Sequence, residues 1–204
     1  MDKWKILNLY AGIGGNRKNW ENVEVTAIEN NEEIANVYKD FFPNDTVIIE
    51  DAKKYLVKNY KNFDFIWSSP PCQSHSKMRM MSSKRGSYEP IMPDLSLYSE
   101  ILFLQHFADC LWVVENVKPY YLPIIPPVQK LGRHYLWSNF EIPFIEIDDG
   151  LSHNERGMHH KGFFDLRNHK LSHRKDQIIR NSVDPKLGEY VFNCALRTFL
   201  EKNL

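Results

Sequence analysis

Residues 63–73 have the sequence FDFIWSSPPCQ, in which an apolar run is followed by two prolines and a cysteine. A short, continuous apolar run of this kind predicts a strand that is buried on both faces of a parallel sheet. Pro70 and Pro71 each fix their own backbone φ angle, so the chain leaves the strand along one stiff path. We therefore expect the thiol of Cys72 at the carboxyl edge of the sheet, where open α/β folds bind their ligands.

The sequence on either side alternates short apolar stretches with helical patterns. Strands are predicted at residues 6–10, 23–29, 46–50, 63–68 and 111–115. Helices are predicted at residues 31–42, 52–60 and 95–110. This order predicts a doubly wound, mostly parallel α/β sheet of the Rossmann-like type.

Other parts of the chain have weaker patterns. The polar segment 73–93 contains glycine and proline and predicts a long loop, and such loops are often functional lids. Residues 134–137 predict a short strand, whereas residues 139–173 show little periodicity. The helical spacing of residues 185–200 predicts an amphipathic helix, and Pro185 suits its first turn.

The chain has 204 residues and a formal net charge of 0, so it has no basic field over the whole molecule. A nucleic-acid site would therefore have to be local. Residues 77–85 and 159–175 are rich in lysine and arginine and could supply one. Two solvated surface loops would explain these charges equally well.

The 3 cysteines predict a reducing compartment, because their number is odd and no pair has the spacing of metal ligands. No metal site is expected. No apolar stretch is long enough for a signal peptide or a membrane span, so we expect a cytoplasmic protein with no membrane partner.

A glycine turn and two acids predict a cofactor that carries adenosine. Gly12 and Gly14 follow the first strand and allow a tight turn that a ligand approaches closely. Glu29 ends the second strand, where an acid commonly accepts the hydroxyls of a ribose, and Asp51 follows the third strand. A structural turn with two helix N-caps is the alternative interpretation.

Cys72 and Glu115 are the candidate chemical groups. A free cysteine is most often a small core residue, but Cys72 follows a diproline and begins a polar segment. Glu115 ends an apolar strand, where we expect desolvation to raise its pKa and favour the protonated form. A protonated carboxyl group could donate a proton or a hydrogen bond to a substrate. A helix cap or an ion-pair partner is the alternative.

Together these segments resemble the C5-cytosine DNA methyltransferases. The matching segments are NLYAGIGG at 8–15, PCQ at 71–73, ENV at 115–117, Arg133 in the place of a motif of spaced arginines, and RNSV at 180–183. Asn8 replaces the usual aspartate of the first motif and Tyr10 the usual phenylalanine. Arg180 stands where the last motif usually has glycine.

The resemblance implies methyl transfer from S-adenosylmethionine to carbon 5 of a cytosine that is flipped out of double-stranded DNA. Cys72 would add to carbon 6 as a thiolate, and Glu115 would hydrogen-bond the ring nitrogen and the exocyclic amine. Arg133 would favour the thiolate or hold the ring carbonyl. The resemblance also suggests a restriction–modification enzyme of a bacterial or phage-infected cell.

The resemblance further implies two sets of binding residues. The cofactor site would be lined by Tyr10, Ala11, Gly12, Gly14, Glu29, Asn30, Asp51, Ala52, Pro71, Leu97, Asn181, Ser182 and Val183. The segment after Cys72 would close on DNA through Gln73, Ser74, Ser76, Lys77 and Arg79. We accordingly expect a catalytic domain at 1–138, a short target-recognition region at 139–173, and a segment at 174–204 that returns to the catalytic domain.

Three alternatives remain open. Because residues 139–173 are few for a recognition domain, the chain could be a cofactor-binding module that needs a partner subunit or self-association to bind DNA. Some relatives modify transfer RNA, so an RNA cytosine is a second possible substrate. Residues 69–71 also resemble the start of the amino-methyltransferase motif, although Cys72 stands where those enzymes place an aromatic residue.

Overall fold

The computed structural model describes residues 3–147 and 164–202, and a single sheet organises them. Its strand order is β3-β2-β1-β4-β5-β7-β6. The strands are β1 (Trp4–Leu9), β2 (Val23–Ile28), β3 (Thr46–Ile48), β4 (Phe65–Ser68), β5 (Leu111–Val117), β6 (Gln129–Leu131) and β7 (His134–Ser138). Strands β1 to β5 pair in parallel, and β7 runs antiparallel to both β5 and β6. The predicted doubly wound, mostly parallel α/β fold is confirmed.

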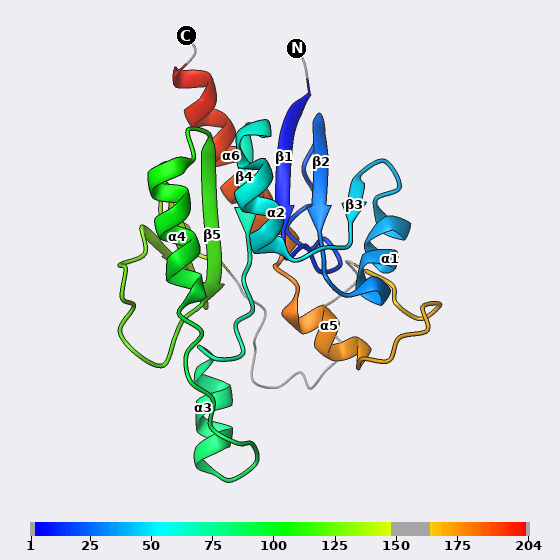
Figure 1. Ribbon diagram of the computed structural model, residues 1–204, viewed down its shortest axis with the longest axis vertical. Coiled ribbons are helices and arrows are strands. Elements are labelled where there is room, and N and C mark those ends of the chain that lie inside the picture. Colours follow the sequence, from blue (N-terminus) through cyan, green and yellow to red (C-terminus); the bar gives the residue numbers. More distant parts are fainter. Residues whose placement is uncertain (1–2, 148–163, 203–204) are drawn as a thin grey trace.

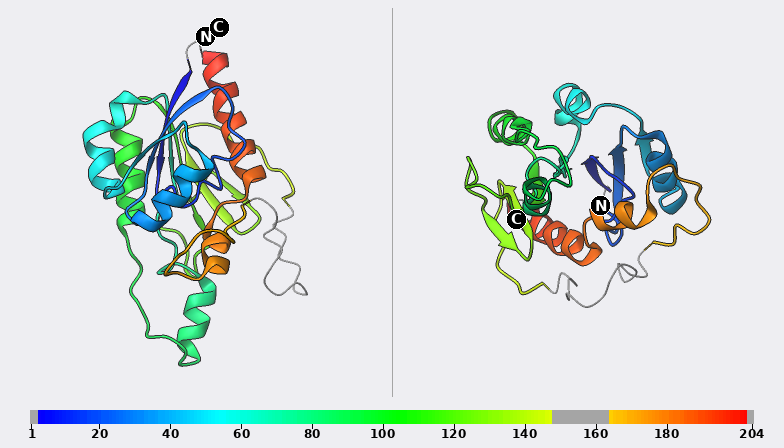
Figure 2. Two further views of the ribbon diagram at one scale, coloured as in Figure 1. Left: turned by 90° about the vertical axis from the view of Figure 1, so that its right-hand side faces the viewer. Right: turned by 90° about the horizontal axis from the view of Figure 1, so that it is seen from below.

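Helices cover both faces of this sheet (Figures 1 and 2). They are α1 (Glu32–Phe41), α2 (Ala52–Asn59), α3 (Lys77–Lys84), α4 (Ser96–Phe107), α5 (Lys175–Asn181) and α6 (Pro185–Lys202), with a short 3-10 helix at Tyr60–Asn62. Side chains of α6 such as Val191 share a buried cluster with Ile6 of β1. Leu7, the next residue of β1, instead packs with Leu56 of α2 and Leu104 of α4 on the opposite face. Burial on both faces explains why the central strands are continuously apolar.

The predicted loop at 73–93 contains a helix, so that expectation was wrong in part. Helix α3 begins after Ser76, whose side chain caps it by accepting a hydrogen bond from the Arg79 amide at 3.4 Å. Lysine, methionine and arginine have high helix propensity, and this favours a helix although none of its residues is buried. Figure 1 shows α3 projecting beyond the carboxyl ends of the strands.

The described residues that follow position 163 pack against the glycine turn. Phe164 and Leu166 are buried in a cluster with Ile13 and Val37 of α1.

Residues 148–163, which include much of the proposed recognition region and the start of the second basic segment, lie outside the described residues. No helix among the described residues is long and apolar enough to cross a membrane.

Candidate active site

The candidate residues gather where the chain changes direction in the sheet. Strands β1 and β4 are neighbours, but the chain continues from β1 towards β2 and from β4 towards β5. Parallel strands that diverge in this way leave a crevice at their carboxyl ends, which is where open α/β sheets bind ligands. Gly12, Glu29, Asp51 and Cys72 all follow the carboxyl end of a strand, and Glu115 lies near the end of β5.

The glycine turn after β1 is fixed beside Glu29. Gly12 has a φ of 55°, in the left-handed region that favours glycine, and a Cβ atom built there would meet nothing within 4 Å. Its amide donates a hydrogen bond to Glu29 Oε2 at 3.0 Å, and the Asn31 amide donates to Oε1 at 2.9 Å. The turn therefore presents open backbone next to an oriented carboxylate.

Asp51 serves as a helix cap, as the structural alternative expected. Its Oδ1 accepts a hydrogen bond from the Lys54 amide at 2.9 Å and caps α2, while Asn31 caps α1 in the same way. The cap occupies one oxygen of the Asp51 carboxylate, and a carboxylate offers two. Capping and ligand binding are therefore compatible here.

A buried acid that the motifs do not identify anchors the turn from the other side. The Tyr10 hydroxyl donates to Glu100 Oε2 at 3.0 Å, and the Ser68 hydroxyl donates to Oε1. Burial raises the pKa of Glu100, and the bonds from Ser68 and Tyr10 only partly oppose it. The signal in the sequence was an acid three residues after Leu97 on the apolar face of α4, since positions three apart share a helix face.

The C-terminal segment forms the remaining wall of the turn. A Cβ atom on Gly15 would lie 2.2 Å from the Val183 carbonyl oxygen and 3.0 Å from Ser182 Cβ, so only glycine allows this approach. The Trp20 indole donates to the Gly188 carbonyl at 3.1 Å. Ser182 and Val183 thus lie against the turn, whereas Asn181 is exposed at the end of α5.

The turn that carries Cys72 is held by the neighbouring strand. The Asn116 side chain donates to the Pro70 carbonyl at 2.9 Å, and the His75 amide closes the turn by donating to the Cys72 carbonyl at 3.0 Å. Burial and the nearby charge of Glu115 raise the pKa of the Cys72 thiol, and Arg133 opposes this only in part. The thiol is therefore protonated at rest.

Glu115 differs from the sequence-based expectation. Its side chain is buried, but His134 Nδ1 lies 2.6 Å from its Oε1 and the Ser69 hydroxyl donates to its Oε2 at 2.9 Å. Burial raises the pKa of Glu115, but the combined effects of His134, Ser69 and Arg133 outweigh it and the net shift is downward. The prediction of a raised pKa was wrong, because strand position indicates burial but not hydrogen-bond partners.

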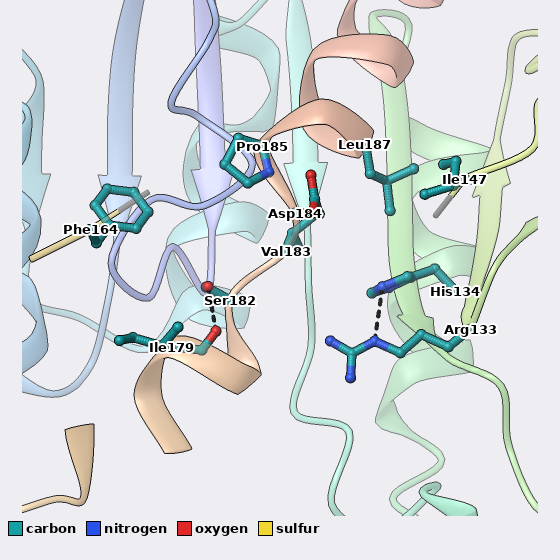
Figure 3. Close-up of a pocket in the computed structure, with 10 residues that line it drawn as sticks. All are labelled: Arg133, His134, Ile147, Phe164, Ile179, Ser182, Val183, Asp184, Pro185 and Leu187. Carbon is teal, nitrogen blue, oxygen red and sulfur yellow. Dashed lines mark hydrogen bonds between the residues drawn. The ribbon is translucent and has the colours of Figure 1, made fainter. Parts of the chain in front are cut away.

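Arg133 lines a pocket together with His134, the hydrogen-bond partner of Glu115. Its Nε donates to His134 Nε2 at 3.3 Å, and its Nη2 donates to the Arg180 carbonyl at 3.2 Å. Figure 3 shows the side chains of Arg133 and His134 on one wall of the pocket, opposite Ser182, Val183 and the start of α6. Sequence reasoning selected Arg133 but missed His134.

The five residues proposed to meet DNA lie at the base of α3 and in its first turn. Ser74 accepts a hydrogen bond from the Asp94 amide at 3.0 Å, and Gln73 and Lys77 are exposed. The Arg79 guanidinium lies 4.2 Å from the centre of the Tyr88 ring, on the segment that returns from the helix. These contacts hold the two arms of the projection together.

Comparison with known proteins gives a family match over most of the sheet. The family described as C-5 cytosine-specific DNA methylase matches residues 4–119, which include the glycine turn, Cys72 and Glu115. No curated protein sequence matches the chain.

Several solved structures are distantly similar to the chain. A DNMT2 variant from Spodoptera frugiperda is 27% identical and covers 57% of this chain and 36% of its own, with a TM-score of 0.40. A hypothetical protein of Thermus thermophilus is 18% identical, with coverages of 71% and 76% and a TM-score of 0.47. A SAM-dependent methyltransferase from Agrobacterium tumefaciens is 16% identical, with coverages of 58% and 40% and a TM-score of 0.40.

Proposed function

The chain belongs to the C-5 cytosine-specific DNA methylase family, and on that premise we propose that it methylates carbon 5 of cytosine in DNA through a covalent adduct with Cys72. One observation carries the proposal. Cys72 follows β4 and Glu115 lies near the end of the adjacent β5, and the bonds from Asn116 to Pro70 and from Ser69 to Glu115 tie the two strand ends together. A nucleophile and a proton-handling carboxylate thus share one site.

The residues at the carboxyl edge fit S-adenosylmethionine. The open backbone at Gly12 would accept a close ligand, and Glu29, beside it, has carboxylate oxygens suited to ribose hydroxyls. Asp51 and the segment at Ser182 and Val183 would complete the site, together with the other residues implied by the family motifs. When bound, S-adenosylmethionine supplies an electrophilic methyl group on its sulfonium sulfur.

We propose that the proton transfers of the reaction run between Cys72, Glu115 and the cytosine ring. Glu115 takes the thiol proton of Cys72 and passes a proton to the ring nitrogen N3, while Sγ bonds to carbon 6 of the cytosine. Carbon 5 would then be electron-rich and could take the methyl group that S-adenosylmethionine supplies. The carbon-5 proton leaves to solvent, the N3 proton returns through Glu115, and the bond between Sγ and carbon 6 breaks, which regenerates the thiol and the aromatic ring.

The projection that carries α3 is our candidate for the element that meets DNA. A stacked cytosine must leave the duplex to reach Cys72, which costs a few kcal/mol. Lys77 and Arg79 lie in the first turn of α3, beyond the carboxyl ends of the strands, where the flipped base would enter. Residues 139–173 remain our proposal for target recognition, with a partner subunit or self-association as the alternative source of specificity.

Methyl transfer tests the function directly. The protein is incubated with radiolabelled S-adenosylmethionine and either mixed-sequence duplex DNA or transfer RNA, and the methylated base is identified after digestion. Wild type should yield 5-methylcytosine in DNA. Cys72→Ala should yield none while still binding cofactor. Cys110→Ala, a matched removal of a thiol immediately before β5, should remain active. Methylation at an amino nitrogen, or transfer by Cys72→Ala, would sink the mechanism.

A further inference from the structure

The side chain of His134 connects two groups of the candidate site. It is 6% exposed, and it lies between the Arg133 guanidinium and the Glu115 carboxylate. Neither the family match, which ends at residue 119, nor the motif comparison assigns it a role. A buried imidazole in contact with a catalytic carboxylate can determine the protonation state of that carboxylate.

Donor and acceptor chemistry assigns the proton on His134. Arginine has only donors, so the contact from Arg133 Nε requires His134 Nε2 to accept. The single ring proton of the neutral imidazole is then on Nδ1, which faces Glu115 Oε1 at 2.6 Å.

The same chemistry assigns the proton on Ser69. The Trp67 indole nitrogen is a donor only and contacts Ser69 Oγ at 2.9 Å, so the hydroxyl accepts there. Its own proton is free to go to Glu115 Oε2, at 2.9 Å. Glu115 therefore accepts one hydrogen bond on each oxygen, and two such donors favour the ionised carboxylate.

We propose that His134 is a positioning residue that keeps Glu115 ionised at rest, so that Glu115 can accept the Cys72 proton when cytosine arrives. This inference rests on the proposed function. A carboxylate as buried as Glu115, which is 5% exposed, would otherwise hold its proton and could not act as the first base. Without that base the thiol, whose pKa is raised, would remain protonated.

The charged and titratable groups around the pair of Glu115 and His134 come from three other parts of the chain. Cys72 faces Glu115 from the turn after β4, and Arg133 faces both side chains from the β6–β7 turn. Asp184 lines the pocket with Arg133 and His134 from the segment before α6. Glu115 is on β5 and His134 on β7. Among the charged and titratable groups named here, His134 is the one with a hydrogen bond to the Glu115 carboxylate.

Two substitutions at the same position separate positioning from packing. His134→Asn places an amide nitrogen near the position of Nδ1 and keeps a donor, whereas His134→Ala removes the donor. The carboxyl carbon of Glu115 is titrated by NMR in ¹³C-glutamate-labelled protein without cofactor or DNA, with Glu115→Gln to assign the signal. The acid limb of kcat/KM for methyl transfer is measured on the same proteins.

Wild type and His134→Asn should titrate Glu115 below its ordinary pKa of 4.5, and His134→Ala should titrate it above that value. The acid limb of kcat/KM should move upward by at least about one pH unit in His134→Ala alone, a roughly tenfold loss on the acid side. A Glu115 midpoint that does not move in His134→Ala, or that moves equally in His134→Asn, overturns the inference. If the midpoints behave as expected but no 5-methylcytosine forms, only the proposed function fails.

Discussion

Replacement of Gly188 by alanine tests how the C-terminal helix meets the glycine turn. Gly188 is buried in the first turns of α6, and a Cβ atom there would lie 2.3 Å from the Asn16 carbonyl oxygen and 2.5 Å from Asn16 Cα. Both are backbone atoms, which cannot rotate away as the end of a side chain can. Asn16 also exchanges hydrogen bonds with the buried Asn8, at 2.8 and 3.5 Å.

The expected size of the effect follows from two opposed contributions. Alanine in place of glycine inside a helix contributes about 1 kcal/mol of stability through helix propensity. Overpacking a close contact costs about 1–3 kcal/mol, and the upper end applies because the clash is with backbone. We therefore expect Gly188→Ala to lower the free energy of unfolding by about 2 kcal/mol, although helix propensity alone predicts a gain.

Urea unfolding measures this change, and titration calorimetry with S-adenosylmethionine measures its effect on the turn. Asn193→Ala is the matched control, since Asn193 is exposed on the same helix. The control should be at least as stable as wild type, because alanine has a higher helix propensity than asparagine, and it should bind cofactor equally. If Gly188→Ala is as stable as Asn193→Ala and binds cofactor normally, the close contact between α6 and the glycine turn does not exist as described.

Three further outcomes follow from the site. Glu115→Gln should lower the pKa of the Cys72 thiol because it removes a nearby negative charge, so iodoacetamide should alkylate Cys72 faster at pH 8. The alkylation rate of Cys110, whose pKa is raised to about 11, should not change. Equal rates at Cys72 in the variant and wild type would contradict this prediction. Asn116→Ala should cost about 1–3 kcal/mol in urea unfolding, because it leaves the buried Pro70 carbonyl unpaired, and it should reduce methyl transfer. Unchanged stability and activity would contradict a structural role for this bond. Because the pKa of Glu100 is raised in the folded state, the native protein holds this proton more tightly, and stability should fall as pH rises above 4.5. Glu100→Gln should reduce that fall, and an unchanged slope would exclude Glu100 as its source.

The parallel part of the sheet could be predicted because each strand is a local pattern. Continuous apolar runs such as residues 65–68 are buried on both faces, and a helix or turn signal separates each from the next. The glycine turn, Glu29 and Cys72 follow from the same logic, since a residue just after a parallel strand lies at the carboxyl edge.

The antiparallel edge of the sheet could not be predicted in the same way. Strand β6 is only three residues long, and the pairing of β7 with β5 places Leu136 opposite Glu115 across a proline-rich connection. This register places His134 within reach of Glu115, and no local pattern encodes it. The error in the pKa of Glu115 has the same origin, because its partner lies 19 residues away on another strand.

The contact between Trp20 and Gly188 joins residues 168 positions apart, and this separation bears on the order of folding. Closing so long a loop costs more entropy than closing the shorter connections between strands, and it places the contact among those that slow folding. The parallel strands can pair through much shorter connections, so the sheet is expected to form before α6 docks. The cofactor wall at Ser182 and Val183 would then be the last part of the site to assemble, and affinity for S-adenosylmethionine would report the final step of folding.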